Sequence, residues 1–249
     1  MRRIGLPETW DAREADRGFM ASLATLAFVS LGLELVVAGT VLTATGSLPA
    51  ATPLGWQCLE WFGIGAVWLL VARALVAWSR RRGVDPLPGA TPEGGQPGTL
   101  DHRRWRGILL CFVAAVVLAL VLPGMLDGSW AVAPVERYTE LFAGYGGLAW
   151  LAMLAWVVRL VGRCAVVASL LAYSHRAVSE LVDRRALRWV PWGGLVTGVL
   201  MAAVALLDRG QAAALTTLLV YLLLGVVHVR SGESLRVTAL FAVPVLALL

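Results

Sequence analysis

The sequence predicts an all-α fold: a polytopic transmembrane helix bundle of six spans, with a cytoplasmic N-terminus and a short seventh span as an open alternative at the C-terminal end. Three observations predict this fold. The 249 residues are 59% hydrophobic, well above the usual content of a soluble domain. The apolar residues form runs of membrane-spanning length. Arginines and tryptophans collect at the ends of these runs.

Six apolar runs are long enough to cross a bilayer as helices. A hydrocarbon core of about 30 Å requires about 20 apolar residues in an α-helix. The first run exceeds the apolar core of about 7–15 residues that marks a signal peptide, so we expect it to stay in the membrane as an anchor. The predicted spans are 19–44, 56–78, 107–126, 145–163, 190–207 and 212–229.

The arginines assign an orientation to these spans. All 21 basic residues are arginine, and arginine-rich connections alternate with arginine-poor ones along the chain. The rich segments precede the first span and follow the second, fourth and sixth, whereas Arg137 and Arg209 each stand alone in a connection on the other side. Cationic segments resist translocation, so the rich side is predicted to face the cytoplasm and its anionic headgroups. Tryptophans near the span ends agree with this assignment, among them Trp56, Trp61, Trp78, Trp105, Trp130, Trp189 and Trp192.

No soluble domain separates the spans, so residues 1–249 are predicted to form one transmembrane domain. The inner segment 79–106 is basic and rich in proline and glycine, a composition typical of a flexible cytoplasmic loop. The tail 237–249 is apolar to its last residue but short. It could half-enter the bilayer, lie along the interface, pack under the bundle, or form a short seventh span that starts at Ser234.

The fourth apolar run, from Tyr145 to Tyr173, is too long for one upright helix at 1.5 Å per residue. The pattern favours a span that ends near Arg163, followed by an amphipathic helix over 164–188 on the cytoplasmic face. Polar residues fall largely opposite the apolar stripe of this second helix. The stripe comprises Val167, Leu170, Leu171, Val178, Leu181 and Val182.

The hairpins 17–78 and 106–163 share an order of residues around their outer loops. Each has a Gly-Ser pair, then a proline, then a Glu-x-Phe sequence, and finally an arginine toward the inner end of the second helix. A tandem duplication of one hairpin would explain the similarity. Chance similarity in a chain of low compositional complexity is the other explanation.

Ionisable groups within spans are costly, of order 2.5–3.5 kcal/mol each, and therefore mark candidate functional sites. Glu34, near the middle of the first span, and Arg159 form the candidate intramembrane polar site. They could pair, or Glu34 could line an aqueous path; alternatively, Glu34 stays protonated and donates one hydrogen bond. Arg163, one turn from Arg159, and Arg73 are weaker candidates because arginines near span ends extend to the headgroups. Glu60 is also weaker, since water solvates the outer interface.

His175 and His228 are both predicted near the inner face, which makes a bis-histidine haem one alternative. A second histidine pair is missing and histidines at span ends commonly lie in headgroup water, so we expect no haem and no other cofactor. The three cysteines are interpreted as small apolar filler. No phosphate loop, zinc-ligand pair, nucleophile elbow or redox cysteine pair occurs in the sequence, so no metal site and no catalytic residue is predicted.

These features favour a small permease or channel-type transport component of the cell (inner) membrane. The lack of lysine and asparagine is typical of a bacterium with a GC-rich genome. An alternative is a non-catalytic subunit or scaffold of a larger membrane complex; a membrane-embedded lipid enzyme is the third. We expect a protein partner subunit and no nucleic acid, because anionic lipid accounts for the positive charge. Enzyme activity is disfavoured, since no cluster of carboxylates, histidines or serines converges at one depth.

Overall fold

The computed structural model describes residues 10–45, 53–87, 102–128, 130, 132–179, 181 and 190–249. Within these residues every regular element is a helix and none is a strand. Six helical segments are long and apolar enough to cross a membrane. The predicted fold class, an all-α transmembrane helix bundle, is therefore confirmed.

The six segments correspond one for one to the six predicted spans. They are Arg17–Val37, Leu54–Arg81, Arg104–Asp127, Ala133–Ser179, Trp192–Arg209 and Gln211–Arg230. Two of them contain an interruption, and a short C-terminal helix follows the last. The helices are α1 (Trp10–Leu31), α2 (Leu33–Thr45), α3 (Leu54–Arg81), α4 (His102–Asp127), α5 (Ala133–Tyr145), α6 (Ala149–Ser179), α7 (Trp192–Arg209), α8 (Gln211–Arg230) and α9 (Leu235–Ala247), with a 3₁₀ turn at Gly146–Leu148.

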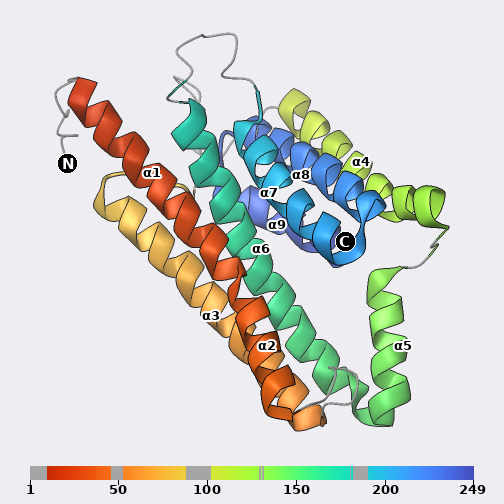
Figure 1. Cartoon of the computed structure of the whole chain (residues 1–249). Coiled ribbons are helices and arrows are strands. Elements are labelled where there is room, and N and C mark those ends of the chain that lie inside the picture. Colours follow the sequence, from red (N-terminus) through yellow and green to blue (C-terminus); the bar gives the residue numbers. More distant parts are fainter. Residues whose placement is uncertain are drawn as a thin grey trace.

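The helices form two groups that share α6. In Figure 1, α1 and α3 run along one side of α6, while α4, α7, α8 and α9 lie on its other side. The first group packs around Leu23 of α1, Trp68 of α3 and Tyr173 of α6. The second packs around Leu171 of α6 and Tyr221 of α8. Because α6 contributes to both cores, it connects the two halves of the bundle.

Glycines allow two pairs of helices to cross in backbone contact. A Cβ on Gly65 of α3 would lie 2.7 Å from the backbone nitrogen of Arg159, and one on Gly162 of α6 would lie 2.5 Å from the Gly65 oxygen. Gly194 of α7 and Gly225 of α8 meet in the same way, with a Cβ on Gly194 only 2.8 Å from the Gly225 Cα. Small residues commonly permit such close approach between membrane helices. The first crossing holds the Arg159 backbone directly against α3.

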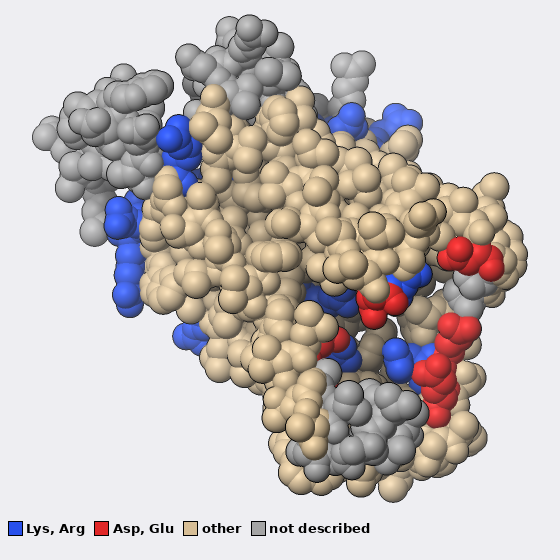
Figure 2. Space-filling view, viewed as in Figure 1, with Lys and Arg blue, Asp and Glu red and all other residues tan. Residues whose placement is uncertain are grey.

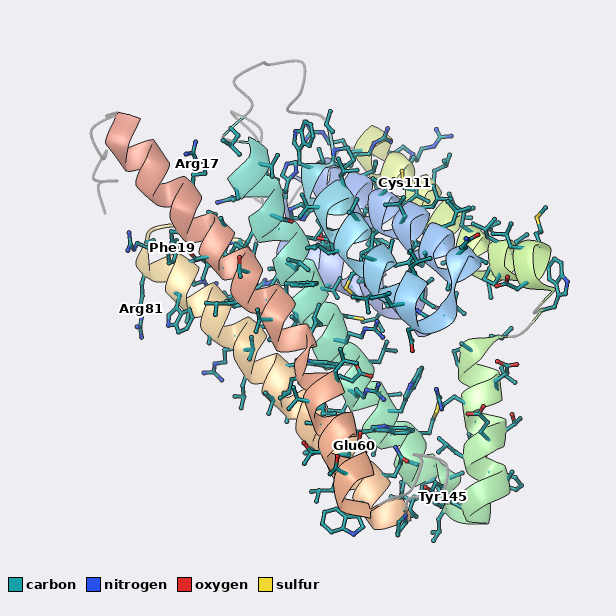
Figure 3. All side chains as sticks on the ribbon, viewed as in Figure 1. Arg17, Phe19, Glu60, Arg81, Cys111 and Tyr145 are labelled. Atoms are coloured by element: carbon teal, nitrogen blue, oxygen red, sulfur yellow. The ribbon has the colours of Figure 1, made fainter. Side chains whose placement is uncertain are left out.

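The basic ends of the helices lie together at one end of the bundle. Figure 3 shows Arg17 and Phe19 of α1 and Arg81 of α3 at that end, and Glu60 at the opposite end of α3. The Arg82 guanidinium lies over the Phe19 ring, 4.9 Å from its centroid. This arrangement is the up-and-down order that the arginine alternation predicts.

The prediction of a separate amphipathic surface helix over 164–188 is wrong for the part of this segment that ends at Ser179. α6 continues as one helix of 31 residues, about 46 Å long at 1.5 Å per residue. Its last turns are enclosed by α1, α3, α7 and α9. Ser169 and His175, on the polar side of the predicted helix, are 0% and 2% exposed. Neighbouring helices rather than solvent cover the polar side, and the rest of the predicted helix, apart from Leu181, lies outside the described residues.

The first part of the loop predicted to be flexible over 79–106 is ordered. It packs against the start of α9, where the Leu235 N–H donates to the Pro86 carbonyl and the Ser234 hydroxyl donates to the Leu87 carbonyl, both at 3.0 Å. The Arg80 guanidinium donates to Asp85 at 3.1 Å, and this hydrogen bond lowers the pKa of the Asp85 carboxyl. Residues 88–101 of the loop lie outside the described part.

The C-terminal helix α9 is a packed element of the bundle rather than a surface helix. Its Ala242, Val245 and Leu246 are buried in the core shared with α4, α6 and α8. With 13 residues it is too short to cross a bilayer alone. Its end nevertheless approaches the far end of α7, where Arg209 donates to the Leu249 carbonyl.

The two hairpins that share an order of residues have different surroundings. α1 packs against α3 and α6, whereas α4 packs chiefly against α8. The second hairpin also contains α5 between α4 and α6, while the outer connection of the first lies mostly outside the described residues. The duplication stays a prediction.

Candidate functional site

The first hydrophobic segment is broken at Gly32, which separates α1 from α2. The Gly32 N–H donates to the Val29 carbonyl and the Leu35 N–H donates to the Gly32 carbonyl, both at 3.0 Å. These bonds span three residues, so a tighter turn interrupts the α-helical pattern here. Glu34 therefore lies in the first turn of α2, where the positive end of the helix dipole favours a carboxylate.

Trp68 of α3 stabilises this break. Its side chain is 0% exposed, and its indole N–H donates to the Ser30 carbonyl at 2.7 Å. Backbone polar groups next to an interrupted membrane helix need partners within the protein, because the bilayer core offers no water. The indole supplies such a partner two residues before the break.

Replacing Trp68 by phenylalanine is expected to lower the free energy of unfolding by about 1–3 kcal/mol, because the Ser30 carbonyl loses a buried donor. The loss should appear in a denaturation titration of the detergent-solubilised protein. Hydrogen exchange should also accelerate in residues 29–36. Trp78→Phe is the matched control, since Trp78 is 43% exposed, and its cost should stay within about 0.5 kcal/mol. Equal effects of the two variants would contradict a role for the indole N–H.

The structure brings the two leading candidate residues together. The Arg159 guanidinium of α6 donates to the Glu34 carboxylate of α2. The side chains keep 22% and 30% of their surface exposed, respectively. The Trp61 ring of α3 lies 5.7 Å from the Arg159 guanidinium carbon, within the range of a cation–π interaction. Three helices thus meet at one partly exposed ion pair.

The weaker candidates do not join this pair. Arg73 is exposed on α3, toward its basic end, as expected for an arginine that extends to the headgroups. Glu60 is half-buried near the other end of α3, and no described residue pairs with it. Arg163 follows Arg159 by one turn. Because α6 continues to Ser179, Arg163 lies near the middle of a long helix rather than at a helix end, and its place at the end of the membrane-spanning part stays a prediction.

A hollow separates α5 from the rest of the bundle. Figure 2 shows it in a face that is otherwise largely uncharged, and acidic and basic side chains gather around it. We call it the outer hollow. The ion pairs carried by the elements around it are Glu34–Arg159, Arg137–Glu140 of α5 at 3.1 Å and Asp208–Arg209 of α7 at 3.8 Å.

A second polar cluster lies at the basic end and contains the two histidines that the sequence places near the inner face. The rings of His175 and His228 are 5.8 Å apart between centroids in an edge-on contact, and the side chains are 2% and 0% exposed. Their predicted position in headgroup water is therefore wrong. His228 Nδ1 lies 2.8 Å from the Thr238 hydroxyl, and Glu233 lies 3.8 Å from His175 and 3.3 Å from Arg176. No spacing in the sequence relates these residues, because α6, α8 and α9 bring them together only in the folded bundle.

Neither cluster resembles a metal centre. In the part of the chain that the structure describes, no three His, Cys, Asp or Glu side chains are arranged to hold a metal ion. The chain matches no family model, no curated protein and no solved structure.

Proposed function

We propose that the chain is a membrane transport component, a small permease or channel, whose solute path passes the Glu34–Arg159 pair. The supporting observation is an ion pair within membrane-spanning segments that keeps part of its surface exposed. An ion pair inside a protein contributes little net stability, because desolvation offsets the attraction. Its occurrence in such a segment therefore favours a functional role.

The helix break supports the same proposal. Transport proteins often form solute sites from discontinuous membrane helices, whose free helix ends face the solute. The interruption at Gly32 creates a helix start inside the first span, with Glu34 in its first turn. In this proposal, solute reaches the pair through the outer hollow.

The proposed location is the cell (inner) membrane of a bacterium, with the arginine-rich helix ends against anionic headgroups on the cytoplasmic side. The outer hollow would then open on the opposite side of the membrane. In the alternative function, a non-catalytic subunit or scaffold, the same hollow would receive a helix of a partner chain. Flux measurements separate the two.

Glu34→Gln is expected to reduce solute flux by about tenfold or more, equivalent to about 1.4 kcal/mol in the barrier. Glutamine keeps a hydrogen-bond acceptor for Arg159 but removes the charge that must be released and regained as solute passes. Purified protein is reconstituted into phosphatidylcholine vesicles, and swelling is followed by light scattering in sodium chloride, sodium phosphate, sodium acetate or glycerol. Size-exclusion chromatography verifies that the variant remains folded.

Asp85→Asn is the matched control for loss of a carboxylate, because Asp85 lies outside the spans and is 43% exposed in its side chain. It should swell at the wild-type rate. A Glu34→Gln variant as fast as wild type would remove the pair from the path. If wild-type vesicles swell no faster than protein-free vesicles and a second chain co-purifies in equal amount, the subunit alternative is favoured instead.

A further inference from the structure

The start of α4 and the end of α8 lie against each other at the basic end of the bundle (Figure 1). Gly107 of α4 faces Arg230, the last residue of α8. A Cβ on Gly107 would overlap the Arg230 guanidinium, and it would lie 3.2 Å from the guanidinium carbon and 3.5 Å from Cδ. The Arg230 side chain therefore passes directly over the α4 backbone, where it fits because glycine has no Cβ.

Two arginines of α4 lie next to this contact. Arg104 precedes Gly107 by three residues and therefore shares its face of the helix, while Arg106 is its neighbour in sequence. Both side chains are exposed, and so is Arg230. Three guanidinium groups that solvent and lipid can reach thus lie at one level of the α4–α8 pair.

The acidic side chains described near this end of the bundle have other partners. Asp85 pairs with Arg80 at 3.1 Å, and Glu233 pairs with Arg176 at 3.3 Å. Among the described residues, no carboxylate forms an ion pair with any of the three arginines at the α4–α8 contact. Like charges at close range repel, so an anion bound between them would be stabilised.

The exposed surface that continues from these arginines along α4 is apolar. Leu110, Val113 and Val117 follow Arg106 on one stripe of the helix and are 71%, 54% and 49% exposed. Trp105, beside the arginines, is 38% exposed. Tryptophan rings settle at headgroup depth in a bilayer. This position puts the guanidinium groups at the level of lipid phosphates, with an apolar surface for acyl chains next to them.

We propose that these groups bind the phosphate of one anionic phospholipid, whose acyl chains lie along the exposed stripe of α4. We call this the Gly107 site, and it consists of Gly107, Arg104, Arg106 and Arg230. Arginine suits the ligand because its planar guanidinium donates two parallel hydrogen bonds to a phosphate. General attraction between arginines and an anionic membrane requires no fixed geometry, whereas this site requires Arg230 to lie over Gly107. The site goes beyond the proposed function, because it shares no residue with the Glu34–Arg159 pair.

Lipid binding is measured on the full-length protein, purified in detergent and stripped of lipid. Phosphatidylglycerol and phosphatidylcholine are titrated separately, and native mass spectrometry gives the Kd of each. One phosphatidylglycerol molecule should bind about tenfold or more tightly than phosphatidylcholine, since its headgroup keeps a net negative charge. Inorganic phosphate is the soluble probe, and it should bind more weakly by about tenfold or more because it buries no apolar surface.

Arg230→Gln is expected to weaken phosphatidylglycerol binding by about tenfold, since it removes charge-assisted hydrogen bonds. Gly107→Ala keeps every arginine but displaces Arg230 from α4, so its affinity should fall between those of wild type and Arg230→Gln. Arg81→Gln is the matched control for charge, because Arg81 is exposed at the same end on another helix (Figure 3). Gly18→Ala is the matched control for the added Cβ, which meets nothing within 4 Å there. Both controls should bind as wild type does.

The proposal is overturned if phosphatidylglycerol binds no more tightly than phosphatidylcholine. It is also overturned if Arg81→Gln weakens binding as much as Arg230→Gln does, because attraction would then follow total charge alone. Inorganic phosphate that binds as tightly as phosphatidylglycerol would reject a lipid as the ligand. Size-exclusion chromatography verifies that each variant remains folded. The flux measurements use phosphatidylcholine vesicles, so failure of either proposal leaves the other standing.

Discussion

Replacing Glu34 by leucine is expected to lower the free energy of unfolding by about 3 kcal/mol, because the Arg159 guanidinium is left unpaired within the bundle. Because the pair is partly exposed, this loss in the free energy of unfolding lies at the lower end of the range for breaking buried ion pairs. The reciprocal variant Arg159→Leu should cost less. A carboxyl group can become neutral by taking up a proton, whereas a guanidinium cannot.

The double variant Glu34→Leu/Arg159→Leu is the decisive comparison. Replacing both partners with apolar residues removes the unpaired charge, so its stability should return to within about 1 kcal/mol of wild type. Denaturation titrations in one detergent give all three values and the coupling energy. Additive losses in the double variant would show that the two side chains do not interact. All three variants should lack flux, because none keeps both charges.

Gly65→Val should also destabilise the protein, by about 1–3 kcal/mol or more. The added Cβ would lie 2.7 Å from the Arg159 nitrogen and 2.8 Å from its Cα, so backbone rather than a mobile side chain must move. Separating α3 from α6 also displaces Arg159 from Glu34. Flux should therefore fall together with the unfolding free energy.

Gly63→Val is the matched control for that prediction. It lies on the same helix, and a Cβ at this position meets nothing within 4 Å. The two variants introduce the same β-branched residue, so the intrinsic helix cost cancels between them. Equal melting behaviour of Gly63→Val and Gly65→Val would contradict the close crossing of α3 and α6.

The span count and the order of the helix ends follow from local properties of the chain. Length and apolarity set the number of spans, and charge asymmetry sets which ends lie together. Glu34 and Arg159 also stand out locally, because isolated charges in apolar runs are rare. That the two side chains meet depends on where the fold places α2 relative to α6 and could only be a hypothesis.

The predictions that fail concern whether a helix is covered by water or by neighbouring helices. The segment after Arg163 carries both apolar and polar positions, a pattern typical of a helix lying on a membrane surface. In the fold, neighbouring helices bury both sides and hold its serine and histidine side chains, as Ser169 and His175 show. Tilt and burial of a long helix depend on packing rather than on its own sequence. For the same reason no pattern indicated that His175 and His228 touch.

The interruption at Gly32 has a mechanical consequence for the first hydrophobic segment. α1 is anchored by fully buried side chains, including Met20, Leu23 and Ala27, whereas no described side chain of α2 is fully buried. Rotation of α2 about residue 32 would therefore expose little apolar surface, and its free-energy cost would be small compared with moving α1. The Glu34 carboxylate thus lies on a short helix that can rotate about residue 32. It can leave Arg159 and return while the core around Trp68 stays intact.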